Sequence, residues 1–197
     1  LIDLRNLHNL DTQIYTHSII FEENIRLWAD YIEFARTKLK VDAVYFQLLK
    51  ETLRNQNSSD PFFEKHFFKD LNETLSIFNE IIKIYKDDSF MGTKAFDIEL
   101  MKSEVINPRE LKLGICQSAS KNIVIDSYGW VQLCMNMYEI MPKDFIGNYK
   151  NLTLTEVWDS TKANNAREIM KNCTKNCGML NCHREVSYEK RNHAVYN

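Results

Sequence analysis

The sequence predicts an α/β protein in which strand–helix pairs in the first half are followed by a small α+β region with a β-hairpin. Two observations lead to this fold class. In residues 13–85 the spacing of apolar residues alternates between that of a strand and that of a helix. In residues 122–134 two short strand-like segments flank a turn that contains a glycine.

The first half contains two predicted strand–helix pairs. Residues 13–20 are rich in β-branched and aromatic side chains, and residues 41–48 form a second, buried run, so both are predicted to be strands. Between them, apolar residues recur at the spacing of one helix face: Ile25, Trp28, Ile32, Ala35 and Leu39. Helical spacing returns in residues 67–85, after a polar loop at 54–60. This order predicts βα units and a parallel sheet that has too few strands here to close by itself.

The second half is built differently. Residues 122–126 and 130–134 are predicted to pair as a hairpin, because Gly129 supplies the permissive backbone that the tight turn between them needs. Residues 154–158 are expected to form a helical turn. Ser160 is the expected N-cap of a further helix that ends near residue 172.

The composition excludes several classes of function. A formal net charge of -2 provides no basic surface, so neither nucleic acid nor membrane is an expected partner. No apolar run approaches the roughly 18 residues of a membrane span, and the first residues lack the apolar core of a secretion signal. We therefore expect a cytoplasmic protein. Because the chain starts at Leu1 and not at methionine, we also expect it to be a piece of a longer protein.

The five cysteines are the unusual feature of the sequence, since all of them lie in the second half. They are Cys116, Cys134, Cys173, Cys177 and Cys182. An odd number of cysteines in a chain without export features argues against a disulfide framework. A bound metal or cluster explains the clustering better, and thiolates are the usual ligands of both iron–sulfur clusters and zinc. Zinc sites, however, usually have closer cysteine pairs than these.

Cys116 and Cys134 flank the predicted hairpin, which brings the two ends of this segment together. If both residues hold one cluster, their sulfur atoms should lie within about 7 Å of each other. Cys173, Cys177 and Cys182 follow the last predicted helix in one short irregular segment that could wrap the other side of the same cluster.

The order of these motifs resembles the SPASM or twitch extension of radical S-adenosylmethionine enzymes. The motifs are Cys116-x12-Gly129-x4-Cys134, then Ile146-Gly147-Asn148, then Val157-Trp158-Asp159-Ser160, and last the closing cysteines. The resemblance is strongest in residues 111–185. Residues 16–51 are similar to the late βα units of the partial barrel in that superfamily.

The resemblance implies a fold and a set of cofactors. Residues 1–95 would be the second half of a partial (β/α)6 barrel, and residues 96–197 a SPASM/twitch-like domain with an auxiliary [4Fe-4S] cluster. That cluster would relay an electron or position the substrate, either a peptide or a small molecule. S-adenosylmethionine and a second [4Fe-4S] cluster would bind in an N-terminal half outside this chain, and an electron donor such as flavodoxin or ferredoxin would be a partner.

The sequence departs from the family pattern in two ways. The C-x3-C-x2-C triplet of the radical-generating cluster is absent, since Cys173-x3-Cys177-x4-Cys182 has a longer second gap. The chain alone is therefore expected to be inactive. A full SPASM domain has seven cysteines for two clusters, whereas five fit one cluster with one cysteine to spare, closer to the twitch type. The expected ligands are Cys116, Cys134 and two of the closing three, with Cys173 and Cys177 favoured. The alternative is a non-catalytic interaction module stabilised by zinc.

Overall fold

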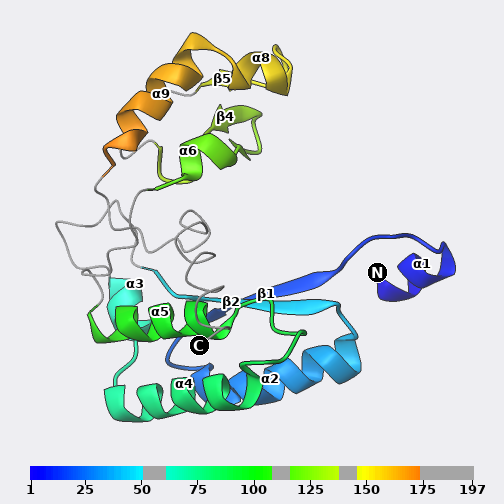
Figure 1. The fold of residues 1–197 in the computed structure, drawn as a ribbon, viewed down its shortest axis with the longest axis vertical. Helices are drawn as coiled ribbons and strands as arrows, with labels where there is room; N and C mark the ends of the chain where they lie inside the picture. The colour runs from blue at the N-terminus through cyan, green and yellow to red at the C-terminus, as the bar shows by residue number, and fades with distance from the viewer. Residues whose placement is uncertain (51–60, 108–115, 138–145, 174–197) are drawn as a thin grey trace. The chain divides into compact units, whose positions relative to one another are not determined.

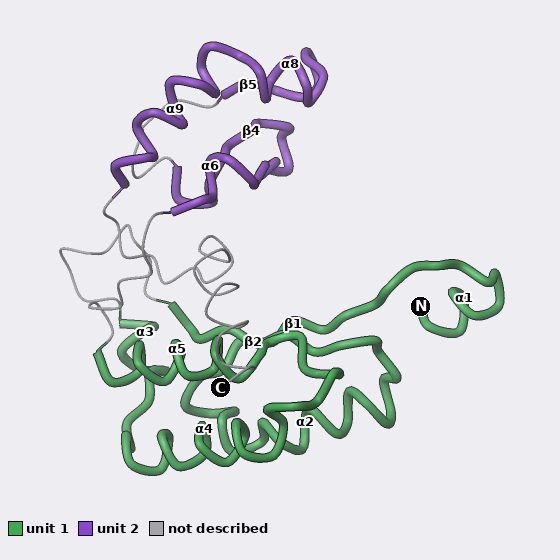
Figure 2. The backbone as a smooth tube through the Cα atoms, in the orientation of Figure 1, with its two compact units in different colours: residues 1–51, 57–111 green, residues 52–56, 112–197 purple. Residues whose placement is uncertain are grey.

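The computed structural model describes residues 1–50, 61–107, 116–137 and 146–173, and the chain divides into two compact units (Figures 1 and 2). Unit 1 comprises residues 1–51 and 57–111, and unit 2 comprises residues 52–56 and 112–197. The boundary predicted between residues 95 and 96 coincides with the start of helix α5 (Ala95–Ile106), which belongs to unit 1. In that unit α5 packs against helix α4 (Leu71–Tyr85).

Unit 1 is built on a parallel pair of strands, as the sequence predicts. Strands β1 (Tyr15–Ile20) and β2 (Ala43–Leu48) pair in register along their whole length. Met91 forms an isolated parallel bridge to Val44, which marks the place of a third strand beside β2. The two strands and one bridge of the described residues are less than half a barrel, so the partial barrel implied by the resemblance remains a prediction.

The helix predicted between the two strands is present but irregular. It begins as a 3-10 turn (η1, Ile25–Leu27), continues as α2 (Trp28–Phe34) and ends as a π turn (η2, Ala35–Leu39). The expected apolar face is buried except at Leu39. Trp28 lies at the centre of this core, because its ring packs edge-on against the rings of Phe46 at 5.3 Å and Phe78 at 5.1 Å. Helices α2 and α4 therefore cover the same face of the sheet (Figure 1).

The next predicted helix, at residues 67–85, starts four residues too early. A short separate helix, α3 (Pro61–His66), precedes α4. The break follows from Asp70, whose side chain accepts a hydrogen bond from the backbone N–H of Glu73 at 3.0 Å and so caps α4. The sequence patterns do not predict α3, α5 or the first helix, α1 (Ile2–Leu7).

The predicted hairpin forms the centre of unit 2. Strand β3 (Val124–Ile125) pairs antiparallel with β4 (Trp130–Gln132), and β4 pairs with β5 (Gly147–Asn148). Gly129 has a φ of 90°, a value that L-residues with a side chain rarely adopt, which confirms its expected role in the turn. Asp126 closes the same turn by accepting the N–H groups of Tyr128 and Trp130.

In the described part of unit 2, three helices pack around this sheet: α6 (Ser118–Lys121), α8 (Leu154–Trp158) and α9 (Thr161–Lys171). Ser160 caps α9 as predicted, since its hydroxyl oxygen accepts the N–H of Ala163 at 3.1 Å. The shared core consists of Ala119, Val131, Leu133, Cys134, Met137, Ile146, Val157, Ala163, Ala166 and Met170. Within the residues that the structure describes, no helix has the length and apolarity to span a bilayer.

The capping box of α8 provides a test of this local structure. The hydroxyl oxygen of Thr153 accepts the N–H of Glu156, and the Glu156 carboxylate accepts the N–H and hydroxyl of Thr153. We expect Thr153→Ala to accelerate amide exchange in residues 154–158 by about fivefold, as the loss of an N-cap does. Hydrogen exchange with mass spectrometry measures this. Thr155→Ala, an exposed change on the same helix, should have little effect, and equal effects of both variants would contradict the role of the cap.

Candidate functional site

The first candidate site lies in unit 2, where two cysteines occupy similar backbone turns. Cys116 is half-buried two residues before α6, and its sulfur accepts a hydrogen bond from the N–H of Ser118 at 3.4 Å. Cys134 is buried two residues after the end of β4, and its sulfur accepts the N–H of Asn136 at 3.3 Å. In both turns the donor lies two residues after the cysteine. A backbone N–H directed at sulfur favours the thiolate, which is the form that binds metals.

Ser118 connects these two turns. Its hydroxyl donates to the carbonyl of Leu133 at 2.8 Å, and the side-chain amide of Asn122 donates to the same hydroxyl oxygen at 3.2 Å. The residue two after Cys116 is thus bonded to the residue directly before Cys134. The structure brings together the turns that hold these two cysteines, and the 7 Å limit on the distance between their sulfurs remains a prediction.

Cys173 is placed by α9. Its N–H donates to the carbonyl of Met170 at 3.0 Å, and the residue is half-buried just beyond the end of the helix. Cys177 and Cys182 lie outside the described residues. Within the described part of the chain, which holds three of the five cysteines, no group of three or more His, Cys, Asp or Glu side chains is arranged to hold a metal ion.

Arg167 holds α9 against the rest of unit 2. Its guanidinium donates to the carbonyl of Ala119 in α6 at 3.2 Å and to the carbonyl of Trp158 at 2.8 Å, and it stacks 4.3 Å above the Trp158 ring. The helix that leads to Cys173 is therefore bonded to the helix that follows Cys116. No local sequence pattern indicates this role, because an arginine in a polar helix is usually a surface residue.

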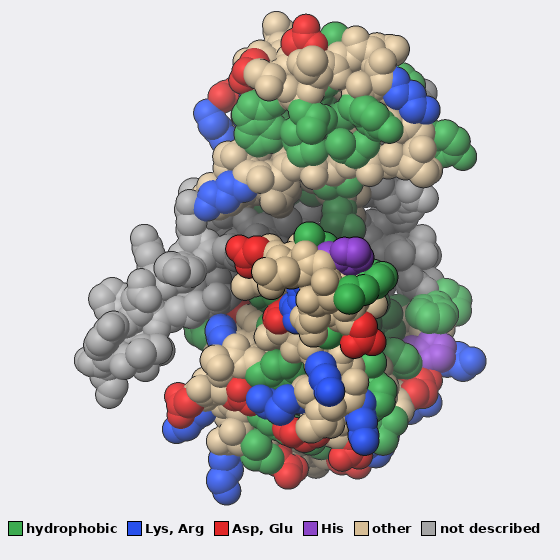
Figure 3. Space-filling view, turned by 90° about the vertical axis from the view of Figure 1, so that its right-hand side faces the viewer, with side chains coloured by type: hydrophobic (Ala, Val, Ile, Leu, Met, Phe, Trp, Pro, Cys, Tyr) green, Lys and Arg blue, Asp and Glu red, His purple; other side chains and the backbone are tan. Residues whose placement is uncertain are grey.

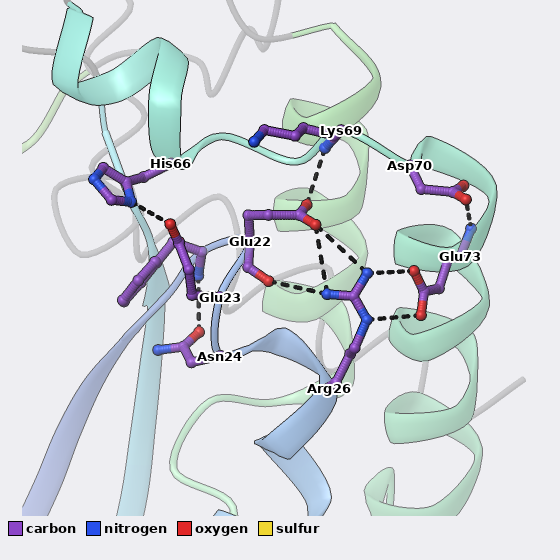
Figure 4. A network of polar contacts seen from close by, with 9 residues as sticks. Glu22, Glu23, Asn24, Arg26, His66, Lys69, Asp70 and Glu73 are labelled. Carbon is purple, nitrogen blue, oxygen red and sulfur yellow. Dashed lines mark hydrogen bonds and ion pairs between the residues drawn. The ribbon is translucent and has the colours of Figure 1, made fainter.

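A second candidate site lies at the carboxyl end of β1, in unit 1 (Figure 4). Arg26 forms a bidentate ion pair with Glu73, with N–O distances of 2.5 and 2.8 Å. It also contacts the carboxylate of Glu22. The hydrogen bond that Arg26 donates to Glu73 is the main cause of the raised pKa of Arg26. The second oxygen of Glu22 accepts the backbone N–H of Lys69 at 2.9 Å. These charges are paired with one another, so this network serves to join α4 to the end of β1.

Glu23 and His66 form a separate pair beside this network. The Nδ1 atom of His66 lies 2.5 Å from a carboxylate oxygen of Glu23, and the Phe62 ring lies 4.5 Å from the imidazole. Partial burial acts to raise the pKa of Glu23, but its backbone hydrogen bond and His66 outweigh this effect and lower it. Ligands of α/β proteins bind beyond the carboxyl ends of parallel strands, where this pair is found.

The face of the β1–β2 sheet opposite α2 and α4 has a different composition from the core. The residues on this face are all exposed or half-buried: Tyr15, His17 and Ile19 on β1, and Tyr45 and Gln47 on β2. His17 pairs with Tyr45 in the sheet, and Ile19 with Gln47. The Tyr45 ring lies 5.4 Å from that of Tyr15 and 6.4 Å from that of His17. The helix-covered face instead buries Val44, Phe46 and Leu48. A parallel sheet is normally covered on both faces, so this aromatic and polar face is suited to contact with a ligand or a further part of a protein.

Comparison with known proteins assigns a domain family to the segment that contains the first site. Residues 116–183 match the family model of SPASM, described as an iron–sulfur cluster-binding domain. The match covers less than half of the chain and extends over all five cysteines. It confirms the SPASM resemblance of this segment and thereby its iron–sulfur cluster binding. Among curated proteins, no match to the chain was found.

The pairing of Glu23 with His66 can be tested by titration. Because the pKa of Glu23 is lowered from its ordinary value of 4.5, its ionised form stabilises the folded state above that pH, and this stabilisation is lost as the pH falls through the lower folded pKa. We expect His66→Ala to raise the pKa of Glu23 when its carboxyl carbon is followed by NMR.

Asp42 provides the control for this titration. The N–H of Ile14 is the main cause of its lowered pKa, with a contribution from Arg5, and neither donor contacts His66. The pKa of Asp42 should stay the same in the variant. An unchanged pKa of Glu23 would show that the contact with His66 does not matter in solution.

Proposed function

We propose that this chain is the C-terminal part of a radical S-adenosylmethionine enzyme, in which the SPASM domain holds an auxiliary [4Fe-4S] cluster. The observation that carries the proposal is the pair of bonded turns in which the sulfurs of Cys116 and Cys134 each accept a backbone N–H. This donor set fits the group, because cluster irons are held by thiolates and hydrogen bonds to the sulfurs stabilise the ligated state.

The proposed ligands are Cys116, Cys134 and two of the closing cysteines, with Cys173 and Cys177 favoured over Cys182. When bound, the cluster would supply one-electron transfer or a surface against which the substrate is positioned. The chain's own contribution is to orient two thiolates and to exclude water from one side of the site. Cys134 lies in the core beside Leu133 and Met137, which are 0% and 1% exposed, and such burial is one of the factors that set a cluster's reduction potential.

Unit 1 supports the proposal of a barrel in residues 1–95. A parallel pair joined by the α2 crossover, a bridge at the place of the next strand and helices on one face are part of what half of a (β/α)6 barrel would contain. On this proposal the opposite face, with His17, Tyr45 and Gln47, would line the inside of the barrel. The side chains there could contact a peptide or small-molecule substrate.

The rest of the proposed enzyme would lie outside this chain. S-adenosylmethionine and a second [4Fe-4S] cluster would bind in a preceding half of the barrel, and a cytoplasmic electron donor such as flavodoxin or ferredoxin would supply electrons. Unit 2 also leaves large apolar side chains exposed, among them Trp130, Tyr149 and Leu152, and Figure 3 shows hydrophobic side chains gathered on one face of this unit. A surface of this kind fits a domain that contacts a larger protein.

Substitution of each cysteine tests the ligand set. Each of the five is changed to serine in turn, and iron and sulfide are measured after anaerobic reconstitution. We expect four variants to lose most of their iron and one, the spare cysteine, to keep it, because a single cluster needs four thiolates. The spare cysteine is the internal control.

Two results would contradict this account. Equal losses in all five variants would indicate a second cluster. One zinc ion per chain, with no iron after anaerobic preparation, would support the alternative of a zinc-stabilised interaction module.

The assignment to radical chemistry gives a further expectation for the chain by itself. Since it has no C-x3-C-x2-C triplet, we expect the reconstituted chain to form no 5′-deoxyadenosine from S-adenosylmethionine with a strong reductant. Chromatography of the reaction products measures this. Formation of 5′-deoxyadenosine that exceeds the amount in a reaction without protein would contradict the proposal that the radical-generating cluster lies elsewhere.

A further inference from the structure

We propose that Ser118 is a positioning residue that holds the two cysteine turns of the SPASM domain at the separation that a bound cluster needs. The inference rests on the proposed cluster function and deepens it. Ser118 is not a ligand and contacts the cluster only through its neighbours. It acts through two bonds, one from its N–H to the sulfur of Cys116 and one from its hydroxyl to the carbonyl of Leu133.

The connection between the two cysteines is short. From Cys116 it passes through the 3.4 Å N–H···S contact to Ser118, then through the 2.8 Å hydroxyl bond to Leu133, whose carbonyl belongs to the peptide bond with Cys134. A change in the Ser118–Leu133 bond therefore moves one turn relative to the other. Because iron–sulfur ligation fixes the distances between sulfurs, such a shift would directly strain a bound cluster.

Burial makes this bond hard to replace. Ser118 is 1% exposed, so water cannot easily take the place of its hydroxyl. The amide of Asn122 donates to the hydroxyl oxygen at 3.2 Å, which leaves the hydroxyl hydrogen to point at the carbonyl of Leu133. Removal of the hydroxyl would leave this buried carbonyl without that donor, which is costlier than the loss of an exposed hydrogen bond.

Ser120 offers a matched control on the same helix. Its hydroxyl also donates to a backbone carbonyl, that of Gln117 at 3.0 Å, but this bond stays within its own turn and the residue is exposed. Ser118→Ala and Ser120→Ala therefore remove the same atom from α6. Only the first variant removes a bond between the two cysteine turns.

The test uses the whole chain after anaerobic reconstitution with iron and sulfide. We expect Ser118→Ala to lose iron to a chelator about tenfold faster than the unsubstituted chain, because the variant lacks one buried hydrogen bond. We also expect a more negative midpoint potential of the cluster, because a weaker N–H···S bond stabilises the reduced cluster less. Ser120→Ala should match the unsubstituted chain in both measurements.

The measurements separate positioning from a general effect on stability. The inference would be overturned if Ser118→Ala lost iron faster but kept an unchanged midpoint potential, or if Ser118→Ala and Ser120→Ala behaved alike. Neither result would contradict the cluster function. Failure of the unsubstituted chain to bind iron would refute the cluster function itself. If Ser118→Ala does not fold, Asn122→Ala removes the donor to the Ser118 hydroxyl and should shift both measurements in the same direction by less. An Asn122→Ala variant indistinguishable from Ser120→Ala would then overturn the inference.

Discussion

The arrangement of unit 2 depends on Arg167 and on the two helix ends that its guanidinium joins. The last carbonyls of a helix have no partner within the helix, and a cation is favoured beside them. Arg167 donates to one such carbonyl at the end of α8, on Trp158, and to another in the short helix α6, on Ala119. Ala163 and Ala166, on the same helix as Arg167, are fully buried, so α9 can approach closely enough for these bonds to form. Besides the shared apolar core, this one side chain thus links the helix that follows Cys116 to the helix that leads to Cys173.

Unit 1 has a comparable constraint in the close contact between Gly92 and Tyr45. A Cβ atom at residue 92 would lie 2.4 Å from the Tyr45 ring, so any larger residue there would require this ring to move. The backbone of Gly92 and Phe90 bonds to Val44, and the hydroxyl of Thr93 bonds to the backbone of Phe46. This contact extends the sheet beyond its two full strands and places the Tyr45 ring on the face that the helices leave open.

Local signals in the sequence were sufficient for the elements that have them. β1, β2 and the hairpin follow from β-branched residues and from Gly129, and Ser160 was recognised as a cap because its role depends on neighbours in sequence. Helix α5 gave no clear stripe, since its apolar residues are spread around the helix, and α6 is only one turn long. Asp70 explains the late start of α4, and its capping role could have been predicted from the spacing of Asp70 and Glu73, which is that of a capping box. The roles of Ser118 and Arg167 depend on residues 15 and 48 positions away, so no local pattern reveals them.

The two cysteine turns orient two of the proposed cluster ligands before a cluster binds. Cys134 is part of the apolar core, and Cys116 is tied to that core through Ser118, so two of the proposed ligands are oriented by packing and hydrogen bonds of the protein itself. Ligands that are already oriented lose less conformational freedom when a cluster binds. Cys173 is placed as well, because its N–H donates to the carbonyl of Met170 at the end of α9. A site organised in this way differs from a small zinc finger, in which metal binding supplies the folding energy outright.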